Sequence, residues 1–229
     1  MVKLVMFDMD GVLFDSMPRH AGAWKQVFAE TGIDIPESEI YLNEGRTSNV
    51  TIDIAFRKYL GKPAPEEIFR PLYRRKCEIA DSYGPMPPMK GAADAVRAVR
   101  AEGIDAIVVT GSGQLKMFNQ LHSFYAGLFR EEWLVCADDV DRKCKPDPEP
   151  YLTGLRKAGG LKPSEAIVIE NAPLGVQAGK AAGCFTVAVN TGPLPDSLLL
   201  ESGADMLLHS MGELSERFSE VLEAQKRYF

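Results

Sequence analysis

Short runs of apolar and β-branched residues recur along this chain, and segments with helical spacing separate them. The runs that read as strands are Val2–Phe7, Ile104–Val109, Trp133–Cys136, Ala166–Ile169, Phe185–Val189 and, more weakly, Asp205–Leu208. The helical patterns between them cover Ala92–Ala101, Leu115–His122, Pro148–Lys157 and Pro173–Ala182. Nearly continuous apolar runs are typical of strands that are covered on both faces. The alternation therefore predicts an α/β core, a Rossmann-like doubly wound parallel sheet.

A stretch of roughly a hundred residues interrupts this alternation after the first predicted strand. Its helical patterns cover Arg19–Glu30, Val50–Leu60 and Glu66–Ala80. The stiff, turn-rich segment Gly84–Pro88 follows them and is suited to lead the chain back to the sheet. We therefore expect an all-helical cap domain over residues 16–86 and an α/β core domain over residues 1–15 and 87–229. Helical inserts above the edge of a sheet often act as lids.

The composition is that of a folded protein, with 45% hydrophobic and 25% charged residues in 229. A net charge of -6 argues against nucleic acid as a partner, because such binding needs a cationic surface. Every apolar run is shorter than the ~20 residues of a membrane span, and the N-terminal residues do not read as a secretory signal. We expect a cytoplasmic protein, by default a monomer, with neither membrane nor nucleic acid as partner.

Four cysteines are spread along the chain without a CxxC pair, at Cys77, Cys136, Cys144 and Cys184. This pattern predicts reduced thiols rather than a disulfide scaffold or a structural zinc site. A redox role for Cys136 and Cys144 is a weaker alternative, since buried structural cysteines are more common.

The first candidate motif is Phe7–Gly11, in which an apolar strand ends in Asp8 and Asp10 and a glycine follows. Open α/β sheets bind ligands at the carboxyl ends of their strands, and a spacing of two puts both acids on one side. Two close carboxylates repel each other unless a cation lies near, which suggests a hard divalent ion such as Mg²⁺. Taken alone, the motif also fits a turn with two solvated acids.

Two further motifs offer groups that bind phosphate. A β-branched run ends in Thr110-Gly111-Ser112, where a hydroxyl and backbone N–H groups at a helix start can hold an anion. Lys145 precedes a proline-rich turn and can steady the charge on a phosphoryl group. Each also has an ordinary explanation, a helix cap and a surface lysine respectively.

The last motif repeats the pattern of a strand that ends in oxygen-bearing side chains, here Glu170 and Asn171. A carboxylate and an amide oxygen can both ligate Mg²⁺ or hold its waters, although the same residues also fit a capped helix start. All four motifs fall where a predicted strand or loop meets a helix. We therefore expect them to converge at one edge of the sheet.

The order and wording of DMDGVLFDS, TGSG, KPDPEPY and IENAPLGVQAG resemble the haloacid dehalogenase superfamily in its phosphatase and phosphomutase branch. The resemblance covers essentially the whole chain. It implies that Asp8 attacks phosphorus and carries the phosphoryl group, while Asp10 acts as general acid and then base. It further implies that Thr110 and Lys145 bind the transferring group, with Gly111 and Ser112 beside them.

The same resemblance implies a Mg²⁺ site. Its ligands would be the Asp8 carboxylate and the Asp10 backbone carbonyl, completed by Glu170 and Asn171. Asn171 departs from the mutase pattern, which has an aspartate there. The second aspartate of the first motif, Asp10, favours phosphate chemistry over carbon–halogen chemistry, because dehalogenase members generally lack it.

Within the superfamily the chain looks closest to β-phosphoglucomutase and its phosphatase relatives. By that likeness His20, Gly45, Arg46 and Lys76 contact substrate or the acid–base aspartate from the cap, and Trp24 packs inside it. The expected function is a Mg²⁺-dependent phosphatase of a small phosphorylated metabolite, a sugar phosphate. The alternative is a β-phosphoglucomutase that interconverts β-glucose 1-phosphate and glucose 6-phosphate. A binding protein with a degraded site would have lost Asp8 or Asp10, and both are present.

Overall fold

A parallel β-sheet forms the centre of the molecule in the computed structural model, which describes residues 1–111, 114–141 and 143–229. Within those residues the strands are β1 (Leu4–Phe7), β2 (Asp105–Val108), β3 (Ala166–Glu170), β4 (Phe185–Val189) and β5 (Met206–Leu208). Their order is β2-β1-β3-β4-β5, and every neighbouring pair is parallel. Strands β1, β3 and β4 are buried along their whole length, as their apolar sequences predict.

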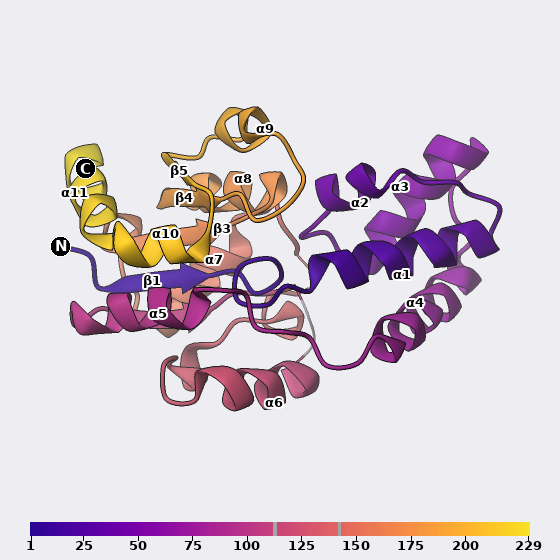
Figure 1. Cartoon of the computed structure of the whole chain (residues 1–229). Helices are drawn as coiled ribbons and strands as arrows, with labels where there is room; N and C mark the ends of the chain where they lie inside the picture. Colours follow the sequence, from indigo (N-terminus) through magenta and orange to yellow (C-terminus); the bar gives the residue numbers. More distant parts are fainter. Residues whose placement is uncertain (112–113, 142) are drawn as a thin grey trace.

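Helices cover both faces of this sheet. One face packs against α5 (Ala92–Ala101), α6 (Gln114–Tyr125), α10 (Met211–Glu216) and α11 (Phe218–Tyr228). The opposite face packs against α7 (Glu149–Lys157) and α8 (Pro173–Ala181), and α9 (Asp196–Glu201) adds a small cluster beside α8. The predicted doubly wound α/β fold is confirmed (Figure 1).

The segment between β1 and α5 is helical and lies beyond the carboxyl end of β1 (Figure 1). Its helices are α1 (Met17–Glu30), α2 (Glu37–Leu42), α3 (Ser48–Leu60) and α4 (Glu66–Ser82). We refer to α1–α4 as the cap helices. They enclose an apolar cluster separate from those of the sheet, in which Trp24 stacks on Phe28 with ring centroids 5.3 Å apart. Trp24 therefore packs among the cap helices, and it also lines the cavity between them and the sheet.

The two chain crossings between the sheet and the cap helices run side by side. The Asp15 backbone N–H donates to the Pro87 carbonyl at 3.0 Å, and the Met89 N–H donates to Leu13 at 2.8 Å. A third connection is apolar, because Leu194, in the loop after β4, is buried within the cluster of the cap helices. The paired linker and Leu194 are thus two of the connections between the cap helices and the sheet, and Leu198 of α9 packs against the same apolar cluster.

One predicted strand is absent, since Trp133–Cys136 lies outside the strands of the described residues. A 3₁₀ turn occupies Glu131–Trp133, and Val135 forms an isolated parallel bridge with Val109. The extended stretch ends at once, because the Asp139 carboxylate accepts the Cys136 N–H at 2.9 Å and closes a second turn. An apolar run of four residues was too short to reveal this.

The remaining chain-wide expectations concern cysteines and membranes. All four cysteines are free thiols, and Cys136 and Cys184 are buried. Across the described residues, no helix is both long enough and apolar enough to cross a bilayer.

Candidate active site

Asp8 and Glu170 lie beside each other at the carboxyl edge of the sheet. The register pairs Phe7 with Ile169, and the Asp8 N–H donates to the Ile169 carbonyl at 3.0 Å. Strand β1 is flanked by β2 on one side and β3 on the other, so the direction of winding changes next to it. Such switch points are where open α/β sheets bind ligands.

A buried lysine bridges these two carboxylates. The Lys145 ammonium forms ion pairs with Asp8 and, at 2.5 Å, with Glu170 Oε1. Tyr151 donates its hydroxyl to the same Glu170 oxygen at 2.5 Å. Asp8, Lys145 and Glu170 are only 6%, 4% and 1% exposed. Because Tyr151 stands on α7, the proline-rich turn before that helix sets both Lys145 and Tyr151 against Glu170.

The charges of this cluster are not balanced. Burial raises the pKa of Asp8 to about 8, and the neighbouring carboxylates of Glu170 and Asp10 add to the effect of burial although Lys145 opposes it. Burial alone would lower the pKa of Lys145, but Asp8 and Glu170 outweigh it and raise that pKa. Because one ammonium faces several carboxylates, the cluster has an excess of negative charge and favours binding of a further cation.

A tight turn follows Asp10 and runs from Gly11 to Phe14. The Gly11 N–H donates to Phe14 at 2.8 Å, and Gly11 has a φ of 75°, a conformation that favours glycine. A Cβ atom at Gly11 would also lie 2.0 Å from Asn171 Nδ2. The glycine of the first motif thus lets the turn approach the loop after β3.

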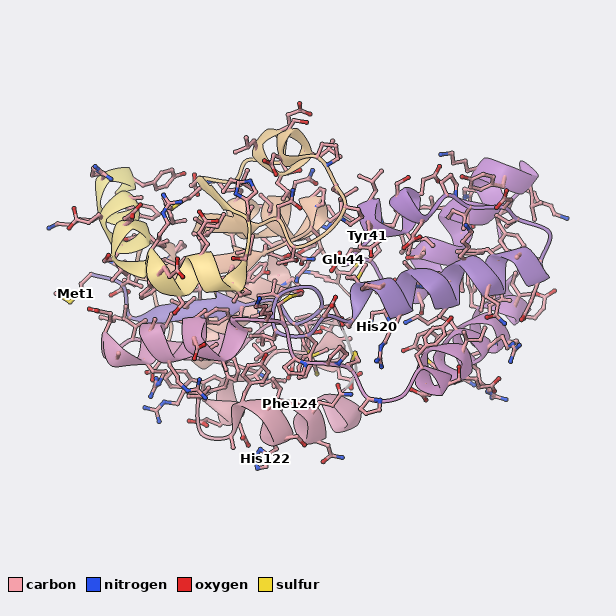
Figure 2. All side chains as sticks on the ribbon, viewed as in Figure 1. Met1, His20, Tyr41, Glu44, His122 and Phe124 are labelled. Carbon is pink, nitrogen blue, oxygen red and sulfur yellow. The ribbon has the colours of Figure 1, made fainter. Side chains whose placement is uncertain are left out.

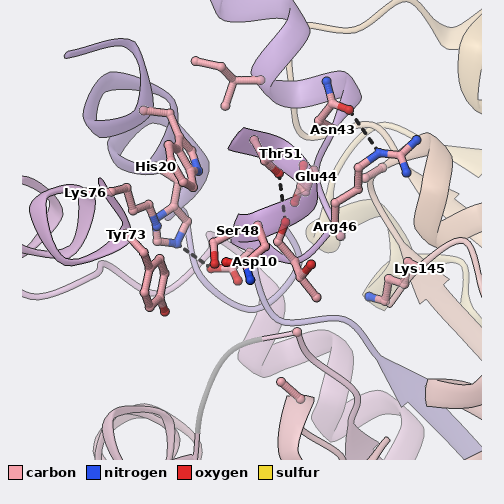
Figure 3. A pocket seen from close by; sticks show the side chains of 18 of the residues that line it. Asp10, His20, Asn43, Glu44, Arg46, Ser48, Thr51, Tyr73, Lys76 and Lys145 are labelled. Carbon is pink, nitrogen blue, oxygen red and sulfur yellow. Dashed lines mark hydrogen bonds and ion pairs between the residues drawn. The ribbon is translucent and has the colours of Figure 1, made fainter. Parts of the chain in front are cut away.

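Asp10 is joined to the cap helices by a hydrogen-bonded chain. Its Oδ1 accepts the Ser16 hydroxyl at 2.5 Å and lies 3.2 Å from His20 Nε2, while His20 Nδ1 lies 2.9 Å from the Lys76 ammonium. An ammonium can only donate, which assigns the imidazole proton to Nε2, facing Asp10. Figure 3 shows His20 between Asp10 and Lys76. Burial opposes ionisation of Asp10, but His20 and Ser16 outweigh it and hold its pKa well below the usual range.

A cavity of about 830 Å³ separates the cap helices from the sheet and opens onto these groups. Asp8, Asp10, Lys145 and Glu170 line it from the core. From the cap side the lining includes the predicted residues His20, Gly45, Arg46 and Lys76. Figure 2 shows Glu44 and Tyr41 at this junction, whereas His122 and Phe124 lie away from it on α6.

The predicted cap loop approaches Lys145 directly. Gly45, with a φ of 91°, lies so close that a Cβ atom there would stand 3.1 Å from Lys145 Cβ. Arg46 lines the cavity next to it, and its Nε donates to Asn43 Oδ1 at 3.0 Å (Figure 3). The short loop between α2 and α3 therefore places a guanidinium within the cavity.

The residues of the second and fourth motifs do not all line the main cavity. Thr110 is buried at the end of β2, where its N–H donates to Val135 at 2.9 Å, and Gly111 lines the cavity. Ser112 lies outside the described residues. Asn171 is buried and lines a smaller cavity of about 420 Å³ rather than the main one, although its amide reaches across to Glu44.

Sequence reasoning gave no role to two residues of this site. Tyr151 is the last residue of the KPDPEPY motif, but nothing in the pattern shows that its hydroxyl meets Glu170. Glu44 directly precedes Gly45-Arg46, and the sequence interpretation of that loop considered the arginine as the phosphate ligand and gave Glu44 no role. The only signal for either residue was its position within a motif already singled out.

Comparison with known proteins places the chain in a family. A family model described as haloacid dehalogenase-like hydrolase matches residues 2–183. The chain belongs to the haloacid dehalogenase-like hydrolase family. Hexitol phosphatase A of Escherichia coli is 32% identical over 93% of both chains. The validoxylamine A 7'-phosphate phosphatase of Streptomyces hygroscopicus subsp. limoneus is 30% identical, over 93% of this chain and 96% of its own.

A solved structure of this haloacid dehalogenase-like group is more similar still. A provisionally assigned beta-phosphoglucomutase from Bacteroides vulgatus is 46% identical and has a TM-score of 0.92, over 98% of this chain and 90% of its own. The chain is therefore an enzyme of the haloacid dehalogenase-like family, from its phosphatase and phosphomutase branch. Members of the family generally use Mg²⁺.

Proposed function

We propose that the protein is a Mg²⁺-dependent phosphatase of a small phosphorylated metabolite, a sugar or polyol phosphate, and that Asp8 carries the phosphoryl group. The observation that carries this proposal is the position of Asp8, at the switch point of the sheet and open to the cavity with Lys145 against it. The pKa of Asp8 is about 8 without a cation, and a divalent cation beside the carboxylate would favour its ionised form. In that form the carboxylate attacks phosphorus without first losing a proton. The phosphatase names of the two curated relatives support the substrate class.

We assign binding of the transferring phosphoryl group to Lys145, Thr110 and the backbone around Gly111. Lys145 is buried beside Asp8, and Thr110 lies at the adjacent strand end. Phosphoryl transfer depends mostly on positioning and on neutralising charge, which a buried ammonium provides.

Asp10 is assigned the proton transfers. The His20 proton and the Ser16 hydroxyl favour its carboxylate form. In that form it accepts the proton of the water that attacks the aspartyl phosphate, and the resulting acid serves the next leaving group. Lys76 holds the imidazole in the orientation that this requires.

The oxygen donors around Asp8 fit a hard divalent cation. We propose that Asp8, the Asp10 carbonyl, Glu170 and Asn171 would bind this cation. A bound cation would neutralise negative charge on the phosphoryl oxygens. Asn171 Oδ1 is buried and accepts no hydrogen bond from any described residue, which leaves it available to an ion or its water. Among the described residues, no three His, Cys, Asp or Glu side chains are placed so that they alone could hold a metal ion. The proposed set of ligands does not need three such side chains, because it includes an amide oxygen and a backbone carbonyl.

We assign the remainder of the substrate to the cap, a domain proposed to span residues 16–86 on a core of residues 1–15 and 87–229. Arg46 stands in the cavity on the cap side and suits a polar or anionic group remote from the reacting phosphorus. Cap residues thereby set the choice of metabolite.

A β-phosphoglucomutase is the second candidate. Two observations favour it, the chain from Asp10 through His20 to Lys76 that joins core to cap, and the similarity to the Bacteroides vulgatus structure. A mutase must keep water from the aspartyl phosphate, whereas a phosphatase must admit it.

Phosphorus NMR distinguishes the two candidates. The enzyme is given Mg²⁺, β-glucose 1-phosphate and a trace of glucose 1,6-bisphosphate, with Asp8→Asn as the inactive control. Release of free phosphate supports the phosphatase, and glucose 6-phosphate without free phosphate supports the mutase. Absence of any reaction across a wider panel of sugar and polyol phosphates would contradict both.

A further inference from the structure

Glu44 is a cap carboxylate that faces the core. It lies in the loop between α2 and α3, is half-buried, and lines the main cavity. The Asn171 amide donates to its two carboxylate oxygens at 3.2 and 3.4 Å. Since Asn171 directly follows β3, this hydrogen bond joins the cap to the strand end that carries Glu170.

The other end of the Asn171 amide is unused by the protein. Its Oδ1 is buried and receives no hydrogen bond from the residues that the structure describes. A buried amide oxygen normally has a partner. Glu44 fixes the amide nitrogen, and the oxygen keeps its capacity to accept from a water or to bind a cation.

Glu44 also joins a group of carboxylates. It lines the same cavity as Asp8, Asp10 and Glu170. Carboxylates gathered around one cavity repel each other unless a cation lies between them. Asn171 contributes an oxygen to that region but no charge, whereas Glu44 contributes a charge from the opposite domain.

We propose that Glu44 supplies from the cap the negative charge that Asn171 lacks, so that the divalent cation site is complete only when the cap lies on the core. The inference rests on the metal site of the proposed function and deepens it. Metal affinity and cap closure are then coupled, because each favours the state in which Glu44 faces Asn171. The competing explanation is that Glu44 is only a hydrogen-bonding latch.

The substitution Glu44→Gln separates charge from hydrogen bonding. Glutamine still accepts from the Asn171 amide but carries no charge. We would titrate the full-length protein with Mn²⁺ and follow free Mn²⁺ by electron paramagnetic resonance. Glu44→Gln should raise the dissociation constant at least about 5-fold. The matched control is Glu78→Gln, which removes an exposed cap charge outside the cavity and should leave it unchanged.

Exchanging the amide and the carboxylate between positions 44 and 171 provides a rescue experiment for Mn²⁺ affinity. In the double variant Glu44→Gln with Asn171→Asp, the amide and the carboxylate trade places, so that charge and hydrogen bond are both kept. Most of the lost Mn²⁺ affinity should return. Circular dichroism of each variant verifies that the fold is intact.

The outcomes discriminate between the two levels of the proposal. Equal Mn²⁺ affinity in wild type and Glu44→Gln would overturn this inference and leave the metal site standing. An equal loss of Mn²⁺ affinity in Glu78→Gln would overturn it as well, because the loss would then come from the lower net negative charge of the protein and not from the position of Glu44. A wild type that binds no Mn²⁺ would contradict the metal site itself.

Discussion

Tyr151 illustrates how one hydroxyl organises the buried charges of this enzyme. It donates to Glu170 at 2.5 Å, and its ring lies 5.3 Å from the Lys145 ammonium. A buried hydrogen bond to an ionised group contributes about 1.5–3 kcal/mol to stability. Tyr151→Phe should therefore lower the free energy of unfolding by an amount in that range, as measured in urea.

Tyr125→Phe is the natural comparison for that variant. Tyr125 is also buried, but its hydroxyl donates to a neutral acceptor, the Leu13 carbonyl. Its removal should cost about 0.5–1.5 kcal/mol, which is less than the cost at Tyr151. If the two variants were equally stable, the charged character of Glu170 in the folded protein would be in question.

Individual residues differed in how far the sequence predicted them. Asp8 and Glu170 were identified because each directly follows a predicted apolar strand, and parallel strands bring such ends together. Asp10 was identified by its spacing of two residues from Asp8. Glu44 and Tyr151 were given no role because their partners are 127 and 19 residues away. No local pattern encodes such contacts.

Among the elements, the loop after β4 has a larger role than its length suggests. Leu194 leaves the core and is buried in the apolar cluster of the cap helices. Removal of a buried leucine side chain costs about 2–5 kcal/mol. Leu194→Ala should lower stability within that range and also loosen the cap, so that small-angle scattering of the free enzyme gives a larger radius of gyration.

Leu199→Ala controls for the loss of the leucine itself. Leu199 is fully buried between α8 and β4, in a cluster that involves no cap helix. It should lower stability to a similar extent without changing the radius of gyration. An equal expansion in both variants would show that Leu194 has no particular part in holding the cap.

The sequence predicted elements well where their period was strong. The helix over Ala92–Ala101 was predicted with its observed bounds, and strands β1 to β4 within two residues. The short helices α2 and α9 and the terminal α10 and α11 were not foreseen. Segments of six residues such as α2 contain less than two full turns, too few to show a helical period.

At the scale of the whole molecule, the paired crossings at Asp15 and Pro87 form a narrow connection between core and cap. Motion about such a connection changes the cavity between the two parts while leaving both folds intact. Mg²⁺ with a phosphate analogue gives the closed state added contacts in the cavity. Scattering should therefore show a smaller radius of gyration with both ligands than without, and an unchanged radius would contradict closure.

The central claim is that Asp8 carries the phosphoryl group, and trapping that intermediate tests it most directly. The enzyme would be mixed with a turned-over sugar phosphate and Mg²⁺, quenched in acid, reduced with borohydride and mapped by peptide mass spectrometry. The account predicts conversion of Asp8 to homoserine in wild type, and neither conversion nor turnover in Asp8→Asn, which should remain folded. Reduction at another carboxylate, or wild-type turnover by Asp8→Asn, would contradict it.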